Sequence, residues 1–171
     1  DAWLPAGLAS FSASLFDTAA DNGDFTDHWA KAREAVLVPG RWGIANTVVP
    51  VWLGLLNDSD KNPAASQILN SSKGAFVIQM LRSLMWDPRT GDQDFTALLH
   101  DFTTQYANRA VSGEDFQTLV EKHMKPSMDY DGSHKMDWFF REWLFTTEIP
   151  SYKLEYSLKP DGAGHPAQAD G

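Results

Sequence analysis

Apolar side chains recur every third or fourth residue through most of this chain, and that spacing restricts the fold more than any other feature. The first stripe predicts a helix to about Ala20, with one face formed by Leu4, Leu8, Phe11, Leu15 and Phe16. Similar stripes follow, separated by turns rich in Gly, Pro, Asn and Asp. They predict helices from Thr26 to about Val36, after Ser71 or Ser72, after Asp92, after Ser112, and from Met136 to about Leu144. The sequence therefore predicts a mainly α-helical fold, an irregular bundle of about six helices.

Three of these helices follow residues that favour helix N-termini. Ser71 or Ser72 is expected to cap the third helix, and Asp92 is expected to cap the fourth. Ser112 and Asp115 form a variant of the capping box, in which Asp replaces the usual Glu or Gln. These caps predict where the third, fourth and fifth helices begin.

Near its end the chain changes from helical spacing to strand spacing. Apolar and polar residues alternate from Tyr152 to Leu158, which predicts a β-strand over residues 151–159. One strand is not stable alone, so we expect it to lead towards a β-rich domain absent from this sequence. Residues 1–150 then form one helical unit. Residues 160–171, rich in Gly, Pro, Ala and Asp, are expected to be a disordered tail.

Composition excludes several classes of function. The formal net charge of −9 disfavours nucleic acid as a partner, because phosphates require Lys and Arg to neutralise them. No apolar run is long enough to span a membrane as a helix. The chain has no Cys, so disulfides, thiolate zinc sites and thiol nucleophiles are excluded. Any catalysis must use carboxylates, His, Ser, Tyr or a metal held by nitrogen and oxygen ligands.

Several blocks resemble one family in its own order. They are Ala2-Trp-Leu-Pro-Ala-Gly-Leu-Ala9, Ser72-Lys-Gly-Ala-Phe-Val-Ile-Gln-Met-Leu-Arg82, Ser112-Gly-Glu-Asp-Phe116, Met136-Asp-Trp-Phe-Phe-Arg-Glu-Trp143 and Pro150-Ser-Tyr152. The first resembles the W-L-x-E-G-x-A block of the gluzincin aminopeptidases, the group of alanyl aminopeptidase and leukotriene-A4 hydrolase. The second resembles that family's Y-x-K-G-A-x-V-L-x-M-L-R helix. The resemblance extends from residue 2 to about residue 158 and implies the C-terminal helical part of the catalytic domain.

The resemblance implies zinc chemistry that this chain does not carry. In the family, an H-E-x-x-H helix supplies two His ligands and a Glu base, and the Glu of W-L-x-E-G completes the zinc site. A Tyr before the K-G pair stabilises the oxyanion. Here the Glu position is Ala6 and the Tyr position is Ser71. H-E-x-x-H is absent, and the family's spacing of about eighteen residues would place it before Asp1. We therefore expect no metal ligand and no catalytic residue in this chain.

Three functional hypotheses follow. In the first, the chain is a helical fragment of a zinc aminopeptidase-like protein whose parent hydrolyses N-terminal residues from peptides. The fragment would hold no cofactor and would not be catalytic alone, although zinc is implied for the parent. In the second, the chain is a pseudoenzyme or a peptide- or partner-binding module of the same fold. In the third, it is a purely structural helical domain.

Arg41, Trp42 and Trp52 lie in the least regular segment, beside the expected cleft. Either they line a pocket in which Arg41 pairs with a substrate carboxylate, or they make ordinary core and surface contacts. The expected partners are a peptide substrate or the missing half of the catalytic domain. Self-association through an exposed apolar face is a further expectation. The family resemblance favours a periplasmic or other extracytoplasmic location, because many bacterial relatives are exported or membrane-associated.

Other chemistries fit the sequence less well. No pair among the five His residues has the i, i+4 spacing of helical metal ligands. No G-x-S-x-G nucleophile elbow is present. A carboxylate pair for glycoside hydrolysis could come from Glu34, Glu114, Asp115, Glu121 and Glu142. We interpret these acids instead as solvated helix faces.

Overall fold

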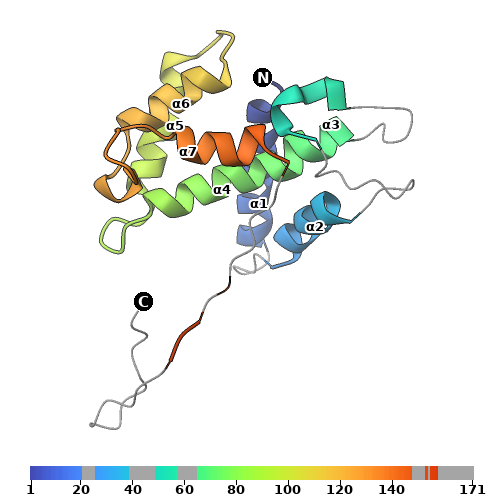
Figure 1. Ribbon diagram of the computed structural model, residues 1–171, viewed down its shortest axis with the longest axis horizontal. Coiled ribbons are helices and arrows are strands. Elements are labelled where there is room, and N and C mark those ends of the chain that lie inside the picture. The colour runs from blue at the N-terminus through green and yellow to red at the C-terminus, as the bar shows by residue number, and fades with distance from the viewer. Residues whose placement is uncertain (21–25, 39–48, 58–64, 148–152, 154, 158–171) are drawn as a thin grey trace.

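The computed structural model describes residues 1–20, 26–38, 49–57, 65–147, 153 and 155–157. These residues are mainly helical, which confirms the predicted α-helical bundle (Figure 1). The elements are α1 (Trp3–Ala20), α2 (Thr26–Leu37), η2 (Val51–Asn57), α3 (Ala65–Ile68), η3 (Leu69–Lys73), α4 (Gly74–Met85), α5 (Gln93–Gln105), α6 (Gly113–Lys122), η4 (Pro126–Met128), α7 (Asp137–Phe140) and η5 (Arg141–Phe145).

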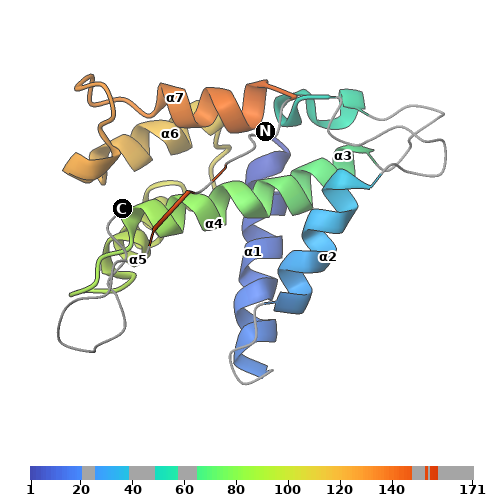
Figure 2. The ribbon, with the colours of Figure 1, turned by 60° about the horizontal axis from the view of Figure 1, so that its bottom comes forward.

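The helix α4 lies at the centre of the arrangement. It crosses α1, which runs beside α2, while α6 and α7 lie on the other side of α4 (Figure 2). At the crossing, a Cβ added to Gly7 would lie 2.8 Å from the carbonyl carbon of Gly74. A Cβ added to Gly74 would lie 3.0 Å from the backbone oxygen of Trp3. The two backbones therefore touch, and this close approach requires Gly on both helices.

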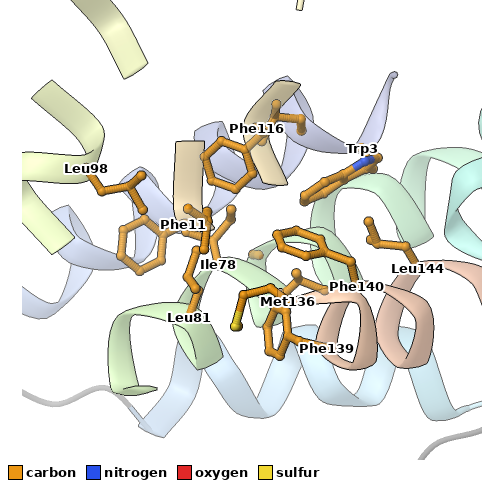
Figure 3. Close-up of a cluster of buried hydrophobic side chains, with 14 of the residues drawn as sticks. Trp3, Phe11, Ile78, Leu81, Leu98, Phe116, Met136, Phe139, Phe140 and Leu144 are labelled. Atoms are coloured by element: carbon orange, nitrogen blue, oxygen red, sulfur yellow. The ribbon is translucent and has the colours of Figure 1, made fainter. Parts of the chain in front are cut away.

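Aromatic rings join the helices in the buried core (Figure 3). The Phe116 ring of α6 meets Trp3 edge to face, with ring centroids 6.2 Å apart, and meets Phe140 in the same way at 6.4 Å. On α1, Phe11 meets Phe95 of α5 at 5.7 Å. Edge-to-face contacts of this kind add to the stabilisation that burial of the rings provides. The core thus fastens α1, α5, α6 and α7 around α4.

The apolar face predicted for α1 is only partly buried. Leu4 and Phe11 are buried as expected, but Leu15 and Phe16 are 39% and 76% exposed. The reason is visible in Figure 2, where α1 crosses α4 near its own first turns and its last turns extend away from α4. The spacing correctly predicted the helix, whereas the crossing point determines which turns of it reach the core.

The predicted caps have different outcomes at α6 and α5. At α6 the capping box is confirmed, since the Asp115 backbone N–H donates to Ser112 Oγ over 3.1 Å and the Ser112 N–H donates to the Asp115 carboxylate over 2.9 Å. At α5 Asp92 occupies the predicted N-cap position, directly before Gln93, but its side chain makes no cap hydrogen bond. Its carboxylate instead accepts bonds of 3.0 and 2.6 Å from Arg82. Charged bidentate bonds of this kind are stronger than a bond from a neutral backbone N–H.

The prediction that Ser71 or Ser72 caps the start of the third helix is wrong. The helix starts at Ala65 and continues through α3, η3 and α4, because the residues that flank η3 keep right-handed helical backbone angles. The Ser71 hydroxyl donates to the carbonyl oxygen of Gln67, one turn earlier. This is the usual way for a Ser inside a helix to satisfy its hydroxyl.

The C-terminal predictions fall largely outside the described residues. The predicted tail, 160–171, lies entirely outside them, and so does most of the predicted strand, 151–159. Of that strand, residues 153 and 155–157 are described, and they have no regular secondary structure. Among the helices of the described part, none has both the length and the apolar character needed to cross a bilayer.

Candidate functional site

The π-helical turn η3 is the centre of the candidate site. It interrupts an otherwise α-helical stretch, and such π turns occur frequently at functional sites. Two of its polar side chains, Asn70 and Lys73, are only 5% and 3% exposed. No described residue donates a hydrogen bond to the side-chain oxygen of Asn70. Burial of polar groups without full hydrogen bonding is costly, so apolar packing alone does not account for this turn.

A second π turn, η5, meets the first at Lys73. The Lys73 ammonium group donates a hydrogen bond of 3.4 Å to the backbone oxygen of Thr146, the residue directly after η5. The carboxylate of Glu142, within η5, acts on Lys73 through its charge. Two rare helical turns from distant parts of the sequence therefore converge on one buried ammonium group.

Burial changes the acidity of this group. Desolvation lowers the pKa of Lys73 from its ordinary value of 10.5, and the charge of Glu142 acts in the opposite direction. A lysine in this environment loses its proton more readily than a surface lysine. When charged, it can donate hydrogen bonds to an anion, and when neutral it can act as an amine base or nucleophile.

The two positions assigned to zinc chemistry by the resemblance lie on the elements that pack together here, α1 and η3. Ala6 is partly exposed and offers only a methyl group, which has no lone pair for a metal. Ser71 donates its hydroxyl to Gln67. The residues at these positions do not fit a zinc ion. Within the part of the chain that the structure describes, no three His, Asp or Glu side chains are grouped to hold a metal.

Of the three predicted cleft residues, the structure describes only Trp52. Arg41 and Trp42 lie outside the described residues. Trp52, on η2, is 50% exposed, and its ring lies 5.8 Å from that of Phe145, which is 52% exposed. The two rings form a surface aromatic pair at the contact between η2 and η5. Trp52 thus lies beside the second π turn.

A polar cleft of about 520 Å³ lies between α1 and α2, and Ser72 of η3 contributes to its lining. Its lining includes the hydroxyls of Ser10 and Ser72 and the side chains of Asp17 and His28. His28 Nδ1 and Asp17 Oδ2 are 3.0 Å apart, so the carboxylate orients the imidazole. The cleft therefore offers both hydrogen-bond donors and acceptors to a polar ligand.

Reasoning from the sequence did not select Asn70 or Lys73. A signal for Lys73 was available, because it occupies the four-residue spacing of the buried Leu69, Val77 and Leu81. A Lys within an apolar stripe departs from the pattern of a core helix face. The π geometry itself has no comparable mark in the residue pattern.

Comparison with known proteins adds no relative to this description. No protein-family model, curated protein or solved structure matches the chain.

Proposed function

We propose that this chain is the helical part of a gluzincin-like catalytic domain whose parent protein removes N-terminal residues from peptides with a zinc-bound water. By itself the chain holds no zinc and hydrolyses no peptide, because the ligand position is Ala6 and H-E-x-x-H is absent from it. The location would be extracytoplasmic, as the family resemblance implies.

The contact between Gly7 and Gly74 carries this proposal. Gly7 is the Gly of the W-L-x-E-G-like block, and Gly74 is the Gly of the K-G-A-like block. The two blocks resemble motifs of one family, and their glycines meet at the closest approach of α1 and α4. One packing requirement, the close approach of the two backbones, therefore explains why each block has a Gly. A π turn that contains the family's Tyr position, Ser71, adds support.

A second candidate function is a pseudoenzyme or binding module of the same fold. The exposed pair Trp52 and Phe145 favours it, because aromatic residues are enriched at protein-binding surfaces. The occupant of this surface would be a peptide, the rest of the catalytic domain or a second copy of the chain. In this case Ala6 and Ser71 replaced the Glu ligand and the Tyr of an ancestor that had zinc chemistry.

The test uses the coding sequence upstream of Asp1 and the protein that the extended reading frame encodes. We expect H-E-x-x-H about eighteen residues before Ala6. In the extended protein, Ala6→Glu should then bind one zinc ion per chain after dialysis, measured by elemental mass spectrometry. Ala9→Glu is the matched control, because Ala9 is exposed on the same helix and outside the ligand position. It should bind no more zinc than the unchanged extended protein.

Different results separate the two candidate functions. An upstream frame without H-E-x-x-H would rule out the zinc peptidase parent and favour the binding module. Equal zinc content in the Ala6→Glu and Ala9→Glu proteins would contradict the assignment of residue 6 to the ligand position. Stoichiometric zinc in the present chain would contradict both candidates.

A further inference from the structure

A small pocket opens between α2, α4 and η5, at the junction of the two π turns. Its volume is about 190 Å³. The walls are mainly apolar and come from Val36, Leu37, Phe76, Met80 and Trp143. Two cationic residues, Lys73 and Arg33, complete the lining. We call this site the Lys73 pocket. It is separate from the polar cleft, which lies between α1 and α2 and shares no lining residue with it.

The ammonium group of Lys73 is incompletely satisfied. It has three N–H donors, and its one hydrogen bond to a described residue is the long one, 3.4 Å, to Thr146. Among the described residues no carboxylate lies within ion-pair distance of it, although Glu142 attracts it from farther away. An almost fully buried cation without a close counter-charge is costly. The remaining donors are therefore available to an anion.

Arg33 adds a second positive charge to the same pocket. It is exposed on α2 and forms no ion pair with any described residue. Lys73 and Arg33 each carry one positive charge and Glu142 carries one negative charge, so the net charge of these three residues is +1. Guanidinium and ammonium groups both bind carboxylates through charge-assisted hydrogen bonds. The charge at this site thus favours a monoanion over a cation or a neutral molecule.

The walls and the volume define the rest of the ligand. An apolar cavity of about 150 Å³ accommodates benzene, so the Lys73 pocket has room for a phenyl ring or a branched alkyl group of similar size. Phe76 and Trp143 offer aromatic surface to such a group. A fully polar anion such as phosphate would leave these walls without apolar contacts.

We propose that the Lys73 pocket binds a small free monocarboxylate with an apolar body, its carboxylate facing Lys73 and Arg33 and its body packed on Phe76, Met80 and Trp143. This site is independent of the proposed zinc chemistry, because it needs neither H-E-x-x-H nor a Glu at residue 6.

Phenylacetate and its neutral analogue phenylacetamide provide the direct test on the unchanged chain. The two ligands have nearly the same shape and differ in charge. Titrations followed by ¹H–¹⁵N NMR should show phenylacetate shifting the signals of Lys73, Phe76 and the Trp143 indole. Phenylacetamide should bind at least about tenfold more weakly, since it lacks the charged hydrogen bonds.

Two variants locate the charge. Lys73→Met keeps the length of the side chain and removes the ammonium group, and Arg33→Gln changes an exposed residue with little risk to the fold. Both should weaken phenylacetate at least several-fold. Lys31→Met is the matched control, because Lys31 lies on α2 like Arg33, is 73% exposed and lines the polar cleft rather than the Lys73 pocket. Its affinity for phenylacetate should equal that of the unchanged chain.

Three results would overturn the proposal. One is the absence of chemical shift changes at millimolar phenylacetate. Another is equal affinity for phenylacetate and phenylacetamide, which requires no variant and therefore stands even if Lys73→Met fails to fold. The last is a set of shifts confined to the polar cleft at Ser10, His28 and Ser72.

Discussion

At the scale of single residues, Arg82 and Asp92 show how one ion pair replaced a predicted helix cap. The guanidinium group donates to both carboxylate oxygens, at 3.0 and 2.6 Å, and links the end of α4 to the start of α5. The hydrogen bond from Arg82 lowers the pKa of Asp92 below its ordinary value of 3.8, and burial offsets this only in part. The charged form of Asp92 is therefore the one that stabilises the fold.

We expect Asp92→Asn to lower the free energy of unfolding at pH 7 by about 1 kcal/mol, a modest value because the pair is partly exposed. Since the folded pKa is lowered, the contribution of Asp92 is present above its unfolded pKa of about 3.9 and is lost as pH falls through the folded value. Urea denaturation at several pH values measures the effect. A difference between the two proteins that persists at the lowest pH would contradict the ion-pair explanation.

Lys73 also has a lowered folded pKa, but here the charged form is the one that destabilises the fold. Its folded pKa is lowered by burial, so the unfolded chain binds more protons between that folded value and 10.5, and stability rises with pH across this window. We expect Lys73→Met to be more stable than the unchanged chain by about 1 kcal/mol at pH 7, because it removes a buried charge. The advantage should shrink towards pH 10, as measured by chemical denaturation.

The control for Lys73 is Lys31→Met, which changes a lysine that is 73% exposed. Its stability relative to the unchanged chain should vary little over the same pH range. A Lys73→Met protein that is less stable by the same amount at every pH would mean that the bond to Thr146 outweighs the cost of burying the charge.

At the scale of elements, the crossing of α1 and α4 depends on backbone contact. Gly7→Ala would place a methyl group 2.8 Å from a backbone carbon of Gly74, and a backbone atom cannot move aside as a flexible side chain can. We expect a loss of about 1–3 kcal/mol in the free energy of unfolding from overpacking. This loss exceeds the gain of up to about 1 kcal/mol that Ala brings to a helix interior over Gly.

Ser12→Ala is the matched control for Gly7→Ala. Ser12 is exposed on the same helix, and its hydroxyl donates to the carbonyl oxygen of Leu8 within that helix. Its replacement should therefore change the free energy of unfolding by less than about 0.5 kcal/mol. Thermal unfolding followed by circular dichroism compares the two variants. Equal stability of Gly7→Ala and the unchanged chain would show that α1 and α4 can separate without cost, which would contradict the packing described here.

The helices illustrate what local sequence can and cannot predict. Apolar spacing predicted α1 and α2 closely, and the box of Ser112 and Asp115 predicted the start of α6, because both signals depend on residues within a few positions of each other. Asp92 also marks the start of α5 correctly, but its side chain does not form the expected cap bond, because Arg82, ten positions earlier, binds the same carboxylate. The start expected at Ser71 failed because that hydroxyl is satisfied inside the helix.

At the scale of the whole molecule, the candidate site shows the limit of sequence reasoning most clearly. The resemblance selected Ala6 and Ser71, and the structure places them on two elements that pack together, α1 and η3. The Lys73 pocket could not be predicted in the same way. It brings Arg33 of α2 and Trp143 of η5 to one lysine of η3, and such a grouping exists only after the helices have packed.

Two surface features of the whole molecule have opposite effects on self-association. The exposed rings of Trp52 and Phe145 favour contact between chains, whereas the formal net charge of −9 opposes it. At 0.1 M salt, repulsion between exposed charges is largely screened beyond about 10 Å, whereas apolar contact is not screened. We therefore expect self-association to increase with salt concentration, as measured by sedimentation velocity.

Replacing the aromatic pair tests whether that patch is the contact. Trp52→Ser and Phe145→Ser should each keep the chain monomeric at salt concentrations where the unchanged chain associates. Tyr130→Ser is the control, because Tyr130 is 85% exposed and packs on Trp138 instead. It should associate like the unchanged chain. If association falls as salt rises, charge pairing rather than apolar contact holds the chains together, and the aromatic pair is not the interface.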